Sequence, residues 1–201
     1  SSDFRPDGRI RERAWKRATP MFLERQTQDG VARPELSTTC RALWSDRFLY
    51  LAYECPFTEL TVFSPTMTAE RVGTPGGSLW DKDVAEAFFS STPHDLTHYT
   101  EFEWAPNGEA LDLKLDLPER DFAWSSRMEY KVRVDQHRKV WTVEVRIPFT
   151  ALAARPPKAG ERWRGNLYRI DRAHKVFLAM NPTLNGSYHT RERFGWVQFE
   201  P

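Results

Sequence analysis

The chain has 201 residues, of which 29 are basic and 28 acidic, so its formal net charge at pH 7 is only +1. This balance leaves no strongly basic surface for nucleic acid. No apolar run reaches the roughly 18 residues of a membrane-spanning helix, so membrane insertion is not expected. At this length, residues 1–201 are expected to form one domain.

The first clear pair of strands is STTCRALW, ending at Trp44, followed by FLYLAYEC, starting at Phe48. A turn at Ser45 joins them, which predicts a hairpin. Cys40 and Cys55 lie on these two strands, but the short turn does not place them directly opposite each other. Two buried thiols are therefore expected rather than a disulfide.

The next segment, residues 56–78, is irregular and contains Thr-Pro-Gly-Gly. We interpret it as a long loop that delivers the chain to Trp80, and loops of this length are often functional. The stretch SLWDKDVAEAFFSS follows and reads as a buried strand with Glu86 inside it. A charge within an apolar strand is costly unless it is paired, hydrogen-bonded or facing a ligand.

The rest of the chain also alternates apolar and polar residues, as strands do. Residues 110–117 place four leucines on one face, and residues 139–147 place Trp141 and three aliphatic side chains on one face. Further strands are expected at residues 98–106, 130–135, 162–171, 176–180 and 194–199, and a short helical turn at 148–154. About ten strands joined by turns predict an all-β, antiparallel, jelly-roll-like β-sandwich.

Seven segments together resemble a known family: AWKRA, LWSDRFLYLAYEC, LWDKDVAEAFF, YTEFEWAPNGEALD, VWTVEVRIPF, GERWRGNLYRID and SYHTRERFG. In this order and spacing they are similar to the family 9 carbohydrate-binding modules and their single-domain bacterial relatives. The resemblance covers nearly the whole chain. It implies a β-sandwich that binds a mono- or oligosaccharide without catalysis, holding a sugar ring between two aromatic side chains.

The resemblance also implies particular site residues. In the family, a tryptophan six residues before a glutamate forms one wall of the sugar slot, and Trp80 and Glu86 match that spacing. The second wall is an aromatic residue near the C-terminus, and here Tyr188 stands where family members carry tryptophan. A sugar ring has an apolar face that suits an aromatic side chain, while its hydroxyls need polar partners.

Three further residues complete the implied carbohydrate site. Asn185 precedes Tyr188 as an asparagine does in the family. Glu101 lies near a family position that can carry a cationic partner, and Arg169 lies near one that contacts the ligand. The sequence does not identify the sugar or any partner enzyme.

Each of these residues also has a structural interpretation. Trp80 could be one more core tryptophan, and Glu86 could pair with Arg169 as a structural ion pair. Asn185 and Gly186 could form no more than a tight turn. Tyr188 could be a surface residue after that turn.

Other chemistries remain as alternatives. Glycoside hydrolysis needs two carboxylates about 5 Å apart or somewhat more, and candidates are Asp83, Glu86, Glu101 and Glu103. No phosphate-binding glycine loop or Gly-x-Ser-x-Gly motif is present. We therefore expect no catalytic residues.

Metal and haem binding are the second alternative. Related sandwich domains hold haem, for which Met180 with His98 or His189 would be candidates, although a methionine in a strand more often fills a core. His94 and His98 have the spacing of two helical metal ligands, but Pro93 and the following strand leave barely one helical turn. No cofactor is expected, while a structural calcium stays open, with hard oxygen donors at Asp81, Asp83, Asp112, Asp116 and Asp171.

The N-terminal stretch SSDFRPDGRIRERAW lacks the apolar core of a signal peptide, as a processed chain would. The family nevertheless implies a bacterial, secreted protein, extracellular or periplasmic.

Overall fold

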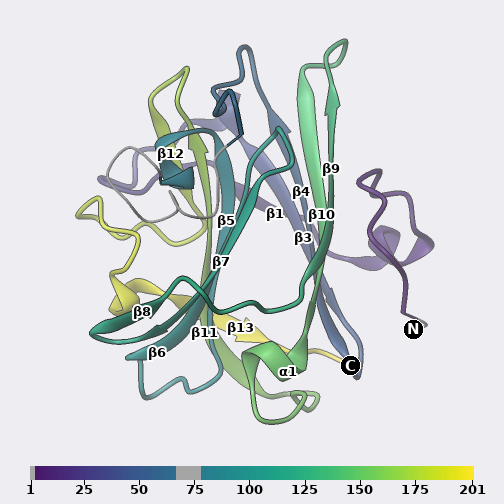
Figure 1. Ribbon diagram of the computed structural model, residues 1–201, viewed down its shortest axis with the longest axis vertical. Coiled ribbons are helices and arrows are strands. Elements are labelled where there is room, and N and C mark those ends of the chain that lie inside the picture. The colour runs from purple at the N-terminus through teal and green to yellow at the C-terminus, as the bar shows by residue number, and fades with distance from the viewer. Residues whose placement is uncertain (1–2, 67–77) are drawn as a thin grey trace.

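The computed structural model describes residues 3–66 and 78–201, which form two antiparallel sheets packed face to face (Figure 1). The smaller sheet has the order β1-β3-β4-β10-β9, with bounds Met21–Leu23, Thr38–Trp44, Phe48–Pro56, Val140–Pro148 and Glu129–Asp135. The larger sheet has the order β2-β12-β11-β5-β6-β7-β8, with bounds Arg25–Gln26, Val176–Ala179, Arg162–Asp171, Val84–Ser90, His98–Trp104, Ala110–Asp116 and Glu119–Asp121. The last strand, β13 (Gly195–Gln198), pairs with one end of β11. The all-β antiparallel sandwich is therefore confirmed.

Helical structure in the described residues is limited to short turns. The α-helix α1 covers Phe149–Leu152, inside the helical turn expected at 148–154. Single 3₁₀ turns cover Arg13–Arg17, Pro34–Leu36, Leu79–Asp81 and Arg191–Arg193. None of these helices is long and apolar enough to cross a membrane.

The predicted strands appear within one or two residues of their expected bounds, with one exception. In the stretch at residues 78–91 the first residues form the 3₁₀ turn Leu79–Asp81, and the strand β5 begins only at Val84. The strands that the sequence did not indicate are β1, β2 and β8, which have only two or three residues each. Such short strands contain too few residues to establish an alternating pattern. The part of the 56–78 loop at residues 67–77 lies outside the described residues.

The main core fills the space between the two sheets. Alternate residues of facing strands supply it, including Tyr53 and Val143 from the smaller sheet and Ala87, Phe102 and Trp104 from the larger one. Cys40 and Cys55 are both buried here as free thiols, as expected. Cys40 pairs in register with Tyr53, so the two cysteines are not directly opposite each other.

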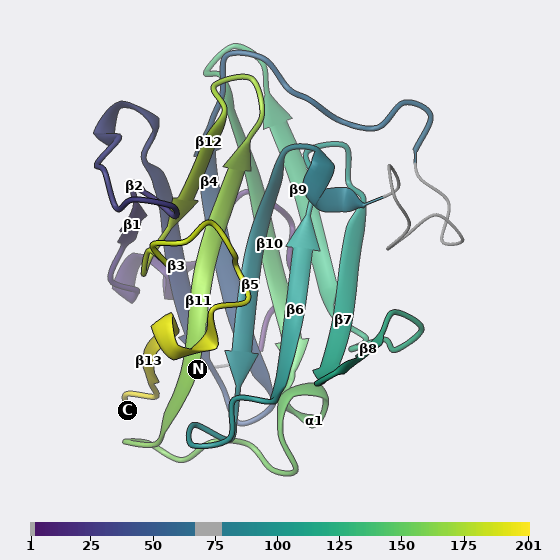
Figure 2. The ribbon, with the colours of Figure 1, turned by 90° about the vertical axis from the view of Figure 1, so that its left-hand side faces the viewer.

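The outer face of the larger sheet carries a second set of buried apolar residues. The leucines of β7 belong to this face, where Leu113 and Leu115 pack with Phe88 and Tyr99. Two segments cover it: the 3₁₀ turn at Leu79–Asp81 and the loop between β12 and β13, which crosses β11 and β5 (Figure 2). This outer face, rather than the core between the sheets, therefore provides the floor of a cavity.

Candidate functional site

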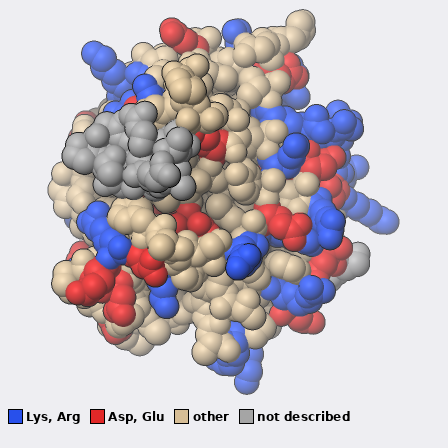
Figure 3. Space-filling view, in the orientation of Figure 1, with Lys and Arg blue, Asp and Glu red and all other residues tan. Residues whose placement is uncertain are grey.

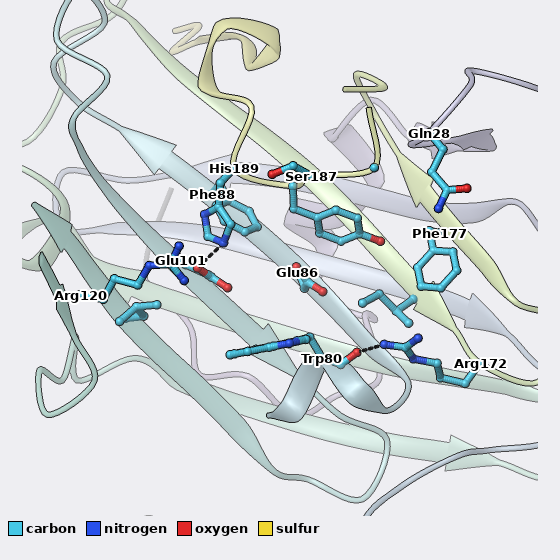
Figure 4. A pocket seen from close by; sticks show the side chains of 14 residues that line it. Gln28, Trp80, Glu86, Phe88, Glu101, Arg120, Arg172, Phe177, Ser187 and His189 are labelled. Carbon is cyan, nitrogen blue, oxygen red and sulfur yellow. Dashed lines mark hydrogen bonds and ion pairs between the residues drawn. The ribbon is translucent and has the colours of Figure 1, made fainter. Parts of the chain in front are cut away.

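A cavity of about 300 Å³ opens on the outer face of the larger sheet. Four of the six predicted site residues line it: Trp80, Glu86, Glu101 and Tyr188. In Figure 4, Trp80 lies on one side and the segment with Ser187 and His189 on the other, with Glu86 between them on the sheet. The remaining lining residues are Gln28, Phe88, Leu113, Arg120, Ile170, Arg172, Phe177 and Gly186.

Trp80 is held at the cavity by hydrogen bonds around Asp83. One carboxylate oxygen of Asp83 accepts from the backbone N–H of Thr61 at 3.0 Å, and the other accepts from the N–H of Arg172 at 2.8 Å. The guanidinium of Arg172 in turn donates to the carbonyl of Trp80. Three separate segments are thereby tied together, and the half-buried indole packs beside Leu79, Val84 and Ile170 rather than in the core between the sheets.

Tyr188 is positioned by a second tyrosine. Its ring stacks on Tyr168 of β11, with centroids 4.3 Å apart and planes 11° apart. The Tyr168 hydroxyl donates to the carbonyl of Tyr188 at 2.9 Å and accepts from the side chain of Asn166 at 2.8 Å. One face of Tyr188 is therefore covered by Tyr168, and the side chain lines the cavity. Burial and the nearby Glu86 raise the pKa of its phenol well above the usual value.

Asn185 lies outside the cavity lining and organises the loop. Its side-chain oxygen accepts from the N–H of Ser187 at 3.0 Å and from the hydroxyl of Thr190 at 2.9 Å. Gly186 follows with φ of +78°, a left-handed conformation that glycine adopts without strain. This arrangement is a tight turn that aims the following residues, including Tyr188, at the cavity.

Arg169 also lies outside the cavity lining, on the opposite face of the larger sheet. The register pairs Glu86 with Tyr168 and places Arg169 beside Ala85, whose side chain belongs to the core between the sheets. Arg169 is 1% exposed, lies over the Trp141 ring at 5.2 Å and approaches Asp171 at 3.8 Å. It therefore pairs with Asp171 rather than with Glu86.

Three glutamates meet at the floor of the cavity. The pairing of β5 with β6 sets Glu86 opposite Glu103 and Phe88 opposite Glu101. One oxygen from each of the three carboxyl groups lies within 4.8 Å of the others, and all three side chains are buried. Burial, together with the neighbouring carboxylates, raises the pKa of Glu86 and Glu103 well above the ordinary value, and burial raises that of Glu101 to about 7. Glu101 is therefore able to exist in either protonation state near neutral pH.

His189 and Arg120 flank Glu101 at the cavity (Figure 4). The Nε2 atom of His189 is 3.9 Å from a Glu101 oxygen, and its Nδ1 is 2.8 Å from the Tyr99 hydroxyl. Burial and the charges of Arg120 and Arg191 lower the pKa of His189 to about 4. The imidazole is therefore neutral at pH 7 and does not neutralise Glu101.

A second carboxyl cluster, Asp7, Glu12 and Glu144, lies on the outer side of the smaller sheet. Glu144 accepts hydrogen bonds from the Trp15 indole at 2.7 Å and from the N–H groups of Asp7 and Gly8. These hydrogen bonds hold the N-terminal segment against β10. The cluster therefore has a structural role.

Four of the five aspartates considered for calcium have protein partners, and those of Asp83 are given above. Asp112 accepts from both the N–H and the hydroxyl of Ser126, and Asp171 accepts from the N–H of His174. Asp116 pairs with His98 at 2.7 Å.

For haem, the candidate ligands are not brought to one place. Met180 packs against the core between the sheets, His189 lines the cavity, and His98 is exposed and pairs with Asp116.

Four polar residues of the cavity lining were not predicted as sugar contacts: Gln28, Arg120, Arg172 and His189, of which His189 was considered only as a haem ligand. No local pattern marks them, because they lie in turns or in the three-residue strand β8 and reach the site only through the tertiary fold. The pairing of Glu86 with Glu103 could have been inferred from strands that run antiparallel, but only with their register known.

Lys and Arg side chains are interspersed with Asp and Glu over the face drawn in Figure 3, in keeping with the nearly balanced net charge.

Comparison with known proteins places the chain among carbohydrate-binding domains. It is 24% identical over 185 residues to a protein of Arthroderma benhamiae named "Extracellular protein", covering 83% of this chain and 80% of that one. Its structure is similar to that of a Bacteroides uniformis protein with a provisional carbohydrate-binding assignment, with a TM-score of 0.77 and 16% identity over 100% of this chain and 94% of that one.

A family 9 carbohydrate-binding module of Caldicellulosiruptor kristjanssonii has a TM-score of 0.69 and 14% identity in its complexes with glucose and with cellotriose. The alignments cover 99% and 100% of this chain and 92% and 90% of the module. A family model described as "Carbohydrate family 9 binding domain-like" matches residues 7–199, and the expectation of a binding domain rather than an enzyme is thereby confirmed. The chain belongs to this carbohydrate family 9 binding domain-like family.

Proposed function

We propose that the cavity binds one sugar ring, either a free monosaccharide or the end of an oligosaccharide, between Trp80 and Tyr188. The observation that carries this proposal is the convergence of two aromatic side chains and a buried carboxyl group, Glu86, on one cavity. Ligand pockets measure about 300–1,000 Å³. At about 300 Å³ this cavity suits a single ring better than a length of chain.

The roles divide by chemistry. The apolar face of the sugar ring stacks on Trp80. The face of the Tyr188 ring that Tyr168 does not cover contacts the opposite side of the sugar. Glu86 and Glu101 bond to the hydroxyl groups, since both line the cavity and both can accept hydrogen bonds.

The other two predicted site residues act indirectly. Asn185 positions Tyr188 through its turn, and Arg169 supports the sheet from its other face.

The experiment is calorimetric titration of the parent protein and of Trp80→Ala with glucose, xylose and their oligosaccharides. Stacking of a planar ligand on an aromatic side chain contributes about 1–3 kcal/mol by analogy with nucleic-acid bases. Trp80→Ala should therefore weaken binding by roughly 5- to 150-fold.

The matched control is Trp196→Ala. Trp196 is 49% exposed, lies on β13 and is absent from the cavity lining, so its removal should leave sugar affinity unchanged. Binding by Trp80→Ala that equals the parent's would contradict the proposed slot.

The proposed ligand also suggests where the protein is located. Plant-type oligosaccharides occur outside the cytoplasm, and the Arthroderma relative is named as extracellular. An extracellular or periplasmic location is therefore part of the proposal. Fractionation of the source cells with an antibody against the chain tests it, and recovery in the cytoplasm would contradict it.

A further inference from the structure

The three glutamates at the cavity floor have more negative charge than their surroundings compensate. Glu86, Glu101 and Glu103 are 1%, 3% and 0% exposed. Among the described residues, the one basic side chain within 4 Å of their carboxyl oxygens is His189, 3.9 Å from Glu101, and its imidazole is neutral at pH 7. The burial of an unpaired carboxylate is costly, so a cluster of three requires protons or a cation.

Glu103 is the most informative member. It does not line the cavity. The side-chain hydrogen bond open to it is with Glu101, another acid of the same cluster, and no other group in the part of the chain that the structure describes donates to its oxygens. One oxygen of Glu86 and one of Glu101 are likewise sealed from solvent without a hydrogen-bond partner. This differs from the Glu144 cluster, where the indole of Trp15 and two backbone amides supply donors.

The spacing of the three carboxyl groups suits a small hard cation. One oxygen from each carboxyl group lies within 4.8 Å of the other two. Calcium binds about 6–8 oxygen ligands at about 2.3–2.6 Å. Two oxygens bound to the same ion are therefore at most about 5 Å apart. Three carboxylates supply up to six oxygens, and the side of the cluster formed by Glu86 and Glu101 opens to the cavity.

The flanking basic residues do not occupy this position. The guanidinium of Arg172 donates to the carbonyl of Trp80, and Arg120 is an exposed residue of β8. An organic amine could reach these oxygens only if its carbon skeleton entered a space that is closed to solvent. A single metal ion is small enough to bind there without such a skeleton.

We propose that Glu86, Glu101 and Glu103 bind a divalent cation of the calcium type at the floor of the cavity, and that its open coordination positions receive hydroxyl groups of the sugar. The second half rests on the proposed sugar-binding function. The first half stands on the carboxyl cluster alone.

The test is calorimetric titration of chelator-treated protein with calcium chloride at neutral pH, with thermal melts beside it. The parent should bind one ion per chain, and its melting temperature should rise with calcium concentration because the ion binds only the folded state. Glu103→Gln keeps the side-chain shape but removes a ligand charge, so calcium affinity should fall at least about tenfold. Because Glu103 does not line the cavity, this variant leaves the sugar-facing residues unchanged.

The control is Asp116→Asn, which removes one acidic charge from an exposed position on β7. It should bind calcium like the parent. Without calcium, Glu103→Gln should melt at or above the parent temperature, since it removes a buried carboxyl group whose ionised form is uncompensated. If this variant does not fold, Glu101→Gln replaces it in the calcium titration and the melts only, because Glu101 lines the cavity. No calcium binding by the parent, or equal binding by the glutamate variant, would overturn the proposal.

Sugar titrations with calcium and with chelator separate this proposal from the proposed function. Sugar affinity that rises with calcium in the parent but not in Glu103→Gln supports both halves. Sugar binding that is equal in chelator and calcium refutes the bridging role and leaves the sugar site intact. Calcium binding without affinity for any sugar refutes the proposed function while the cation site stands.

Discussion

Replacing Arg169 by methionine distinguishes a structural residue from a ligand contact. Methionine is similar in length but carries no charge, so it fills the space over the Trp141 ring and removes the cation. Asp171, 3.8 Å from the guanidinium, and Asp83 are then left with less compensation, and they are only 4% and 0% exposed. The charge of Arg169 holds down the pKa of Asp83 against the effect of burial.

The expected loss of stability follows from that burial. Removing one partner of a buried ion pair costs about 3–5 kcal/mol. For a chain of about 200 residues, 1 kcal/mol lowers the melting temperature by about 2–4 °C. The Arg169→Met variant should therefore melt about 6–20 °C below the parent, while the folded protein keeps its sugar affinity.

The deficit should also depend on pH. Without the cation, the pKa of Asp83 in the folded state rises further above its unfolded value. The folded form then binds a proton more tightly than the unfolded form, so stability is gained as the pH falls through the folded pKa towards the unfolded one. The difference in melting temperature between the parent and Arg169→Met should therefore become smaller as the pH is lowered.

Thermal melts monitored by circular dichroism, with calorimetric sugar titration well below the melting range, provide the assay. Arg162→Met is the control: it lies on the same strand and stacks on Trp196, but it is exposed. Its stability should change by no more than about 0.5 kcal/mol. A variant Arg169→Met that melts with the parent yet fails to bind sugar would refute the structural role.

Two further predictions concern the second wall and the thiols. Tyr188→Trp should tighten binding of gluco- or xylo-oligosaccharides by enlarging the stacking area, and Tyr188→Ala should abolish it; if both bind sugar like the parent in calorimetry, the two-walled slot is wrong. Cys40 and Cys55 should react with a thiol reagent only after denaturation, because both are buried and burial raises the pKa of Cys55 to about 12. Rapid reaction of the native protein would contradict their placement in the core.

Most of the strands were predictable because their signal is local. Side chains alternate between the two faces of a strand, so the pattern in 139–147 or 110–117 identifies a strand without knowledge of its neighbours. The six-residue spacing from Trp80 to Glu86 is also local, and both residues line the cavity. Short edge strands such as β8 carry too few residues for such a signal.

The alternation does not show which face of a strand points into the core between the sheets and which points outwards. The β7 leucines form one face, but only the packing places that face towards the cavity rather than between the sheets. A shift of one residue reverses the face of a strand. That is why Tyr168 lies beneath Tyr188 at the cavity while Arg169, its neighbour, is buried against Trp141.

The strands could be predicted from the alternation within single segments, and their number indicated a sandwich. The Trp80–Glu86 pair came from a six-residue spacing that resembles the family pattern. The fold was needed to show that Glu86 meets Glu101 and Glu103, and that Arg172 and Asp83 tie the turn of Trp80 in place. Those contacts depend on the register between strands and on loops that meet over a sheet face, and neither is encoded in the periodicity of a single segment.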